Sequence, residues 1–210
     1  MERWPLHDGP VCPRCGAFLG SSPAPASPVP CAPCASDPPV FDSARSLFPH
    51  AGDVRAAILA AKYAGRPFPA CAVANRIRSA LAGAWAGLIP DGERPAVVPV
   101  PVHPWKYFRR GFNLPALVGE RLARDLGWPF APLLLSRGLG RAPQAGLPLS
   151  GRRSNVEGAF RVPRGRRPPP RVLLLDDVYT SGATARECAR ALKTGGADHI
   201  VVVTVVRAVP

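Results

Sequence analysis

The chain has 210 residues, which is enough to bury one full hydrophobic core and to carry a small extra module. Its net charge of +13 favours anionic partners such as nucleic acid or phosphorylated ligands, although an arginine-rich, high-GC composition explains the excess equally well. The longest apolar runs, such as Val201–Val206, are too short to cross a bilayer, and the start lacks a secretory signal. We therefore expect a cytoplasmic globular protein without membrane insertion.

Four cysteines near the N-terminus form two CxxC pairs, Cys12–Cys15 and Cys31–Cys34, separated by 15 residues. This spacing matches a four-cysteine zinc ribbon in which Gly16 lets the backbone fold back beneath the metal. Disulfides are the alternative, which a reducing compartment disfavours. We expect structural Zn²⁺, because four thiolates leave no open position for substrate. Cys71 and Cys188 lie in alanine-rich surroundings and are expected to be inert core residues.

After the ribbon, hydrophobic periodicity and chain breakers predict an α/β protein with a mainly parallel sheet. We expect three regions: the zinc ribbon at 1–40, a helical connector or hood at 41–95, and the α/β domain at 96–210. The expected helices are Asp53–Tyr63, Ala70–Leu88, Leu114–Leu126 and Ala185–Lys193. The expected strands are Ala96–Val102, Phe130–Leu135, Val172–Leu175 and Ile200–Val206. The segment Ser136–Arg171 has little periodicity, and we expect a long functional loop that holds a hairpin at most.

The most informative segment is Val172–Thr184, which reads VLLLDDVYTSGAT. An apolar run typical of a buried parallel strand ends in two acids, Asp176 and Asp177. The turn that follows is rich in hydroxyl groups, and its glycine permits φ > 0; its members are Thr180, Ser181, Gly182, Ala183 and Thr184. Such a turn before a helix N-terminus binds phosphate, and the acids suit ribose hydroxyls or hydrated Mg²⁺. The alternative is a strand–helix turn whose acids only cap a helix.

A basic and aromatic cluster follows the expected strand at Ala96–Val102. Its cations are Lys106, Arg109 and Arg110, and arginine forks suit diphosphate oxygens, with a solvated basic turn as the alternative. For His103, between valine and proline, we expect a structural role. The interleaved aromatic residues indicate either a single-stranded nucleic-acid site or core anchors; they are Trp105, Tyr107, Phe108 and Phe112.

These motifs together resemble the ComF family, in which a zinc ribbon precedes a type I phosphoribosyltransferase domain. The family's KYxGR element is seen at Lys62–Arg66, VPVPxHPxxxxxRGFN at Val98–Asn113, and QxxLxxxxRxxNxxGAF at Gln144–Phe160. The chain lacks the threonine that many relatives carry between Arg141 and the glutamine. The middle motifs also resemble loops of glutamine phosphoribosylpyrophosphate amidotransferases.

The resemblance implies a protein that binds phosphoribosyl diphosphate (PRPP) or ribose 5-phosphate with Mg²⁺. Asp176 and Asp177 would be the catalytic acids that hold the ribose hydroxyls, and Thr180–Thr184 would hold the 5′-phosphate. It also implies a role in natural competence, with imported single-stranded DNA and a helicase-type translocase as partners. A non-catalytic DNA-handling adaptor on the same fold is the alternative. No residue indicates which nucleophile would accept the phosphoribosyl group.

Overall fold

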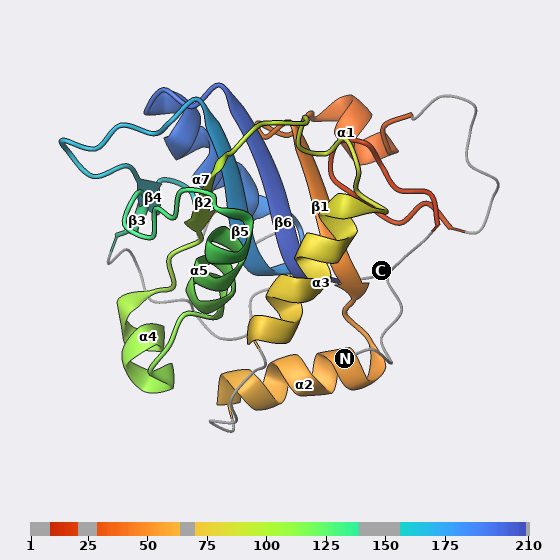
Figure 1. The fold of residues 1–210 in the computed structure, drawn as a ribbon, viewed down its shortest axis with the longest axis horizontal. Coiled ribbons are helices and arrows are strands. Elements are labelled where there is room, and N and C mark those ends of the chain that lie inside the picture. Colours follow the sequence, from red (N-terminus) through yellow and green to blue (C-terminus); the bar gives the residue numbers. More distant parts are fainter. Residues whose placement is uncertain (1–8, 21–28, 64–69, 139–155, 209–210) are drawn as a thin grey trace.

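The computed structural model describes residues 9–20, 29–63, 70–138 and 156–208 (Figure 1). Its centre is a four-stranded parallel sheet with the order β1-β6-β5-β2. The strands are β1 (Ser43–Pro49), β2 (Ala96–Pro99), β5 (Arg171–Tyr179) and β6 (His199–Arg207). The two central strands are rich in Val, Leu and Ile and buried on both faces, as parallel strands are. The expected mainly parallel α/β architecture is confirmed.

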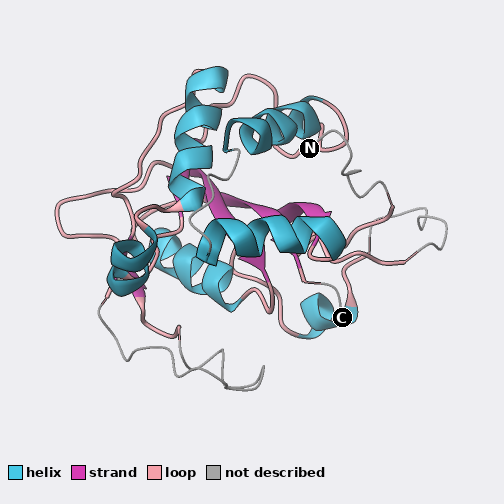
Figure 2. Cartoon of the chain, turned by 90° about the horizontal axis from the view of Figure 1, so that it is seen from below, coloured by secondary structure: helices cyan, strands magenta, loops and turns pink. Residues whose placement is uncertain are grey.

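Helices cover both faces of this sheet (Figures 1 and 2). One face packs against α2 (Gly52–Tyr63), α3 (Ala70–Ala82) and α5 (Leu114–Leu126). The other face packs against α7 (Ala183–Thr194) and the cysteine segment, which contains the short helix α1 (Ala32–Ser36). Two apolar clusters therefore form, one on each side of the sheet. Among the described helices, none is long and apolar enough to span a membrane.

Helix α5 shows how the sequence fixes one of these contacts. Its buried side chains recur at helical spacing, and Gly119 faces the sheet where a Cβ would lie 3.2 Å from side-chain atoms of Val97 and Phe130. Gly127 ends the helix in the left-handed conformation, with φ of 64°. The helix occupies the predicted range, and α2, α3 and α7 also lie where helices were expected, although α3 ends at Ala82.

The expected strand at Phe130–Leu135 is wrong. Only Phe130 forms a bridge, with Val97, because prolines at 129 and 132 donate no backbone hydrogen bond and limit the pairing. The fourth strand of the sheet is instead β1, which pairs with β6 along its length. It lies in the region that we expected to be a helical connector. Polar residues in its first half, Ser43, Arg45 and Ser46, concealed an edge strand with a buried face.

Two further elements differ from expectation in detail. The loop before β5 does contain a short antiparallel pair, β3 (Ser136–Arg137) with β4 (Phe160–Arg161). Residues 139–155 between these strands lie outside the described residues, as do residues 64–66 of the KYxGR element. A short helix, α4 (Pro104–Arg110), forms where a basic turn was the alternative interpretation. Its last residue is followed by Gly111 at φ of 76°, a left-handed C-cap.

Candidate functional site

A cavity of about 490 Å³ opens at the carboxyl ends of β2 and β5. The chain after β2 passes through α4 into α5 on one face of the sheet, whereas the chain after β5 enters α7 on the opposite face (Figure 1). Where connections from neighbouring parallel strands diverge in this way, they leave the crevice in which α/β sheets bind ligands. His50 and Ile58, from the region at 41–95 that we expected to be a connector or hood, also line the cavity.

Asp176 and Asp177 line this cavity from within β5, rather than after its end as the sequence suggested. Pairing with β2 stops at Pro99, opposite Leu175, while pairing with β6 continues to Tyr179. The acids therefore lie on a stretch of β5 that has lost its β2 neighbour, and both are half-buried. The Asp177 backbone N–H donates to Asp176 Oδ1 at 2.8 Å, which holds one carboxylate against the strand.

The hydroxyl-rich turn begins where β5 ends, and Thr180 and Thr184 line the cavity beside the acids. Gly182 is the N-cap of α7 with φ of 76°, so the first turn of this helix directs its unpaired backbone N–H groups toward the turn. Ser181 and Ala183 are not part of the cavity wall, and the Ser181 hydroxyl accepts from the Ala183 N–H at 3.5 Å. The turn thus combines two hydroxyls and a helix N-terminus next to paired carboxylates.

Gly182 also meets a steric demand that the sequence did not show. A Cβ at this position would overlap the hydroxyl of Tyr179 and lie 2.7 Å from Tyr179 Cζ. Tyr179 is buried, and burial raises its pKa to about 12. Glycine at 182 is therefore required both by its backbone conformation and by the tyrosine packed against it.

Three cations also line the cavity: Lys106 and Arg110 from α4, and Arg137 from β3. Arg109, predicted beside Arg110, instead lies outside the wall, with its guanidinium 5.2 Å above the ring of Trp105. Arg137 was missed, because it sits in a non-periodic segment among many other arginines. Burial lowers the pKa of Arg137, and interactions with Cys188 and Asp176 oppose that shift.

Two buried polar atoms in the wall have no hydrogen-bond partner among the described residues: His103 Nε2 and Asn113 Oδ1. His103 caps α4 by accepting the Trp105 N–H on Nδ1 at 3.2 Å, which confirms its structural role and leaves the proton of the neutral ring on Nε2. Asn113 Nδ2 donates to the Val100 carbonyl at 3.1 Å. Unpaired buried polar atoms are rare and costly, so each of these two atoms carries an energetic cost within the wall.

The aromatic residues around α4 are mostly not core anchors. Phe108 is 90% exposed, Trp105 60% and Tyr107 53%, while Phe112 packs against the core. Cys71 is also exposed, contrary to expectation: it lies in the first turn of α3, where Arg121 Nη1 from α5 is 3.7 Å from its sulfur. Cys188 is buried as expected, and burial raises its pKa well above the usual value.

The four N-terminal cysteines come together beside the sheet, where three of them are buried. Their Sγ atoms all lie within 4.8 Å of one another, and Cys15 Sγ and Cys31 Sγ are 3.7 Å apart. The latter distance is too long for a disulfide, and it is close to the roughly 3.8 Å edge of a tetrahedron with Zn–S bonds of about 2.3 Å. The group can therefore hold a metal ion such as zinc. Gly16, at φ of 70°, brings the first turn against the backbone of β1.

The thiols of this group differ in their acidity. Burial raises the pKa of Cys15 and of Cys34. Burial also acts to raise the pKa of Cys12, but the backbone N–H groups of Cys31, Cys15 and Arg14 outweigh it and lower the value to about 7. A metal ligand must be a thiolate, so a bound cation would displace the protons that burial otherwise favours.

Comparison with proteins of known name gives several relatives. The chain is 35% identical over 115 residues to Competence protein F of Haemophilus influenzae, a match that spans 54% of this chain and half of that protein. It is 29% identical over 201 residues to DNA utilization protein YhgH of Escherichia coli O157:H7, covering 93% of this chain and 83% of that protein. Competence protein ComFC of Streptococcus pneumoniae is 30% identical over 110 residues, which covers 52% and 47% of the two chains. No protein-family model matches the chain.

Solved structures with some likeness include an adenine phosphoribosyltransferase, at 16% identity and a TM-score of 0.40, covering 64% of this chain and 69% of that one. An allosteric regulatory enzyme of purine biosynthesis aligns at 21% identity and a TM-score of 0.43, covering 70% and 29%. These scores are too low for the structural likeness to establish anything further. The named relatives, however, confirm the resemblance to the ComF family that the motifs indicated.

Proposed function

We propose that this protein binds PRPP or a related ribose phosphate in the cavity between β2 and β5, and that it acts in natural competence and DNA uptake. The relatives named as competence and DNA utilization proteins support the second part. The observation that carries the first part is the composition of one cavity. It combines the Asp176–Asp177 pair, the hydroxyls of Thr180 and Thr184, and a wall of cations from α4 and β3.

Each part of the ligand finds a matching group in this arrangement. The 5′-phosphate would lie at the N-terminus of α7, where Thr180 and Thr184 offer hydroxyls. The ribose hydroxyls would contact Asp176 and Asp177. Lys106, Arg110 and Arg137 would face the diphosphate, to which arginine can present two donors at once.

Mg²⁺ fits the same donor set, since it prefers carboxylate oxygens and the oxygens of substrate phosphates. Asp176 and Asp177 would hold it together with the diphosphate, and its charge would assist departure of that group. The protein's own contribution to phosphoribosyl transfer would be positioning of ribose C1 and stabilisation of the charges that develop there. In the cysteine centre, we propose structural Zn²⁺ held by four thiolates: Cys12, Cys15, Cys31 and Cys34.

The test is calorimetry of PRPP with and without Mg²⁺ in the wild type, Asp177→Asn and Asp91→Asn. Asparagine keeps the shape of Asp177 but removes its charge, so we expect affinity to fall by about ten- to a hundredfold, as for loss of a charged hydrogen bond of roughly 1.5–3 kcal/mol. Asp91 is exposed in a turn outside the cavity, and Asp91→Asn should bind as the wild type does. Equal affinity in all three proteins, or no binding to the wild type, contradicts the proposal.

A single-stranded DNA-handling adaptor is the second candidate. Helix α4 exposes three aromatic rings beside Arg109, which is the combination of stacking surface and charge that binds single strands. A second cavity of about 490 Å³, next to α7, has Arg161, Arg164 and Arg166 in its wall. Neither feature contributes to the ribose-phosphate cavity, so both functions can coexist on one chain.

Binding of a fluorescent oligonucleotide across a salt series tests this candidate. We expect weak binding that decreases with salt, with a log–log slope of about −0.7 for each neutralised phosphate. Replacement of Arg164, Arg166 and Arg167 by glutamine should reduce that slope. Affinity that is independent of salt contradicts a phosphate-contact mechanism, and no binding at low salt removes the adaptor function.

A further inference from the structure

We propose that the cysteine centre positions the phosphate-binding turn, so that metal occupancy and ribose-phosphate binding are thermodynamically coupled. The inference rests on the proposed function, because it concerns the same turn at Thr180–Thr184. No described residue of the cysteine segment lines the ribose-phosphate cavity. Two separate side-chain connections nevertheless join the two CxxC pairs to that turn. One reaches Tyr179, just before the turn, and the other reaches Arg186, just after it.

The first connection starts at Cys15 and runs through Arg207, the last residue of β6. Arg207 is 9% exposed, and its Nη1 donates to the Cys15 carbonyl at 2.7 Å, while Nη2 lies 3.6 Å from Cys15 Sγ. The same guanidinium lies 4.1 Å from the ring centroid of Tyr179. Tyr179 in turn occupies the space that a Cβ on Gly182 would need. Contacts therefore lead directly from a proposed metal ligand, Cys15, through the buried cation of Arg207 and the ring of Tyr179 to Gly182 in the turn.

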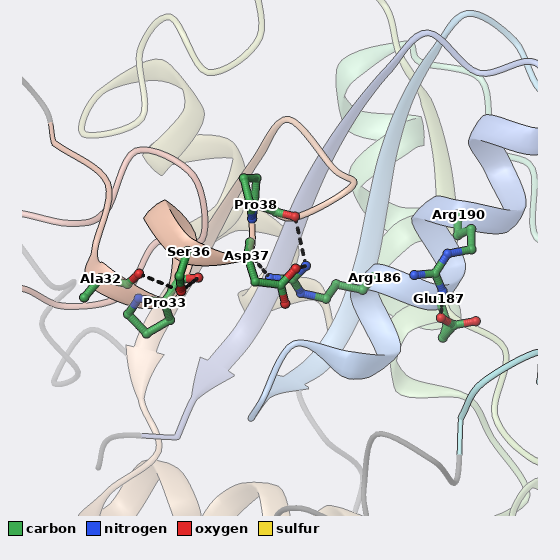
Figure 3. Close-up of polar contacts among 8 residues, drawn as sticks. All are labelled: Ala32, Pro33, Ser36, Asp37, Pro38, Arg186, Glu187 and Arg190. Carbon is green, nitrogen blue, oxygen red and sulfur yellow. Dashed lines mark hydrogen bonds and ion pairs between the residues drawn. The ribbon is translucent and has the colours of Figure 1, made fainter.

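The second connection starts just after Cys34 and reaches the first turn of α7 (Figure 3). Asp37 is the C-cap residue of α1, the helix that carries Cys34. Arg186 donates from Nη2 to the Asp37 carbonyl at 2.7 Å and from Nη1 to the Pro38 carbonyl at 3.0 Å. The Arg186 backbone N–H donates to the Gly182 carbonyl at 2.9 Å, which closes the first turn of the helix. One residue thus joins the second CxxC pair to the phosphate turn.

Both connections depend on backbone carbonyls whose positions the cysteine centre fixes. The described part of the cysteine segment has little regular structure: the five residues of α1 and one bridge between Val11 and Phe18. Four thiols around a metal would hold these carbonyls in place. Without the metal, Arg207 would lose a fixed acceptor while remaining buried, which is costly for a charged group. The packing of Tyr179 and Arg186 against the turn would then loosen.

Coupling of this kind must be reciprocal, because ligand and metal stabilise the same arrangement of the turn. Zinc should raise the affinity for ribose 5-phosphate, and ribose 5-phosphate should raise the affinity for zinc by the same factor. The second effect can be measured on the folded, zinc-loaded chain, and it reports on the link without any assay of catalysis.

The experiment measures zinc affinity by competition with a chelator, with and without saturating ribose 5-phosphate, in the wild type, Arg186→Gln and Arg190→Gln. Arg190 lies one turn further along α7, is 55% exposed against 17% for Arg186, and pairs with Glu187 instead of the cysteine segment (Figure 3). We expect ribose 5-phosphate to raise zinc affinity about fivefold or more in the wild type and Arg190→Gln. In Arg186→Gln the increase should fall below about twofold, because one connection is cut.

Calorimetry of ribose 5-phosphate binding to the zinc-loaded wild type separates the possible failures. Binding without any change in zinc affinity overturns the coupling and leaves the proposed function intact. No binding at all overturns both. If ribose 5-phosphate raises the zinc affinity of Arg186→Gln as much as that of the wild type, the role of Arg186 is overturned. Arg186→Lys keeps the charge but has one donor nitrogen in place of the two that Arg186 uses, so it should recover part of the coupling. It also serves as the second variant if the glutamine variant does not fold.

Discussion

The proposed ribose-phosphate cavity and the cysteine segment differ in what holds them in place. The cavity takes its walls from β5, α4, α7 and the chain after β2, so the hydrogen bonds of the sheet and helices fix its shape. The cysteine segment has only α1 and one bridge among its described residues, and three of its four thiols are buried against the sheet. A ligand side chain in the cavity should therefore be dispensable for folding, whereas a cysteine ligand should not.

The largest expected effect comes from the cysteine segment. Cys34→Ser should abolish stoichiometric zinc and lower the free energy of unfolding by about 3–5 kcal/mol, since zinc binding supplies folding energy to such segments. Metal analysis and urea unfolding measure the two effects. The matched control is Cys71→Ser, because Cys71 is an exposed thiol on α3 outside the cluster. Retained zinc with an unchanged unfolding midpoint in Cys34→Ser contradicts the comparison.

An intermediate effect is expected at the turn Thr180–Thr184, the proposed phosphate site. Gly182 and Gly92 have nearly the same backbone conformation, with φ of 76° and 79°, but only Gly182 has Tyr179 where a Cβ would be; Gly92 has open space. Both valine variants carry the strain of a positive φ, of order 1–3 kcal/mol. Gly182→Val should be less stable than Gly92→Val by about a further 1–3 kcal/mol, from overpacking against the tyrosine. Thermal unfolding of both variants measures this difference in stability. Equal losses of stability would mean that Tyr179 moves aside without cost.

The smallest effect is expected on the exposed surface of α4. Phe108 is 90% exposed on α4, so Phe108→Ala should change the free energy of unfolding by less than about 0.5 kcal/mol. Phe48 is fully buried in β1, and Phe48→Ala should cost about 3–5 kcal/mol. Urea unfolding of the pair tests whether the aromatic residues of α4 serve the fold. A loss above about 1 kcal/mol in Phe108→Ala would show that they do.

What the sequence predicted well is what short-range patterns determine. The CxxC spacing, the range of α5 and the β5–turn–α7 unit each depend on residues that are neighbours along the chain. The polar character of β1 hid an edge strand that only its pairing with β6 reveals. The segment at Phe130–Leu135 has an apolar composition that suits a strand, but its prolines limit its pairing with β2 to a single bridge.

The site itself was predicted unevenly for the same reason. The acids and the turn form one continuous motif, but Arg137 enters the cavity through a hairpin whose strands are far apart in sequence. Arg109 and Arg110 are adjacent, yet helix geometry directs only Arg110 to the cavity and leaves Arg109 over Trp105. Neighbouring residues on a helix point about 100° apart, so adjacency along the chain does not imply a shared site.

The proposed function depends on binding of a ribose phosphate at the turn between β5 and α7. Its most direct test is NMR titration of the ¹⁵N-labelled, zinc-loaded protein with ribose 5-phosphate in the presence of Mg²⁺. We expect the largest amide shifts at Thr180–Thr184 and in the strand residues Asp176 and Asp177, with smaller shifts along α4. Shifts confined to the arginine-rich cavity around Arg161 and Arg164, or no saturable shifts at all, would contradict it.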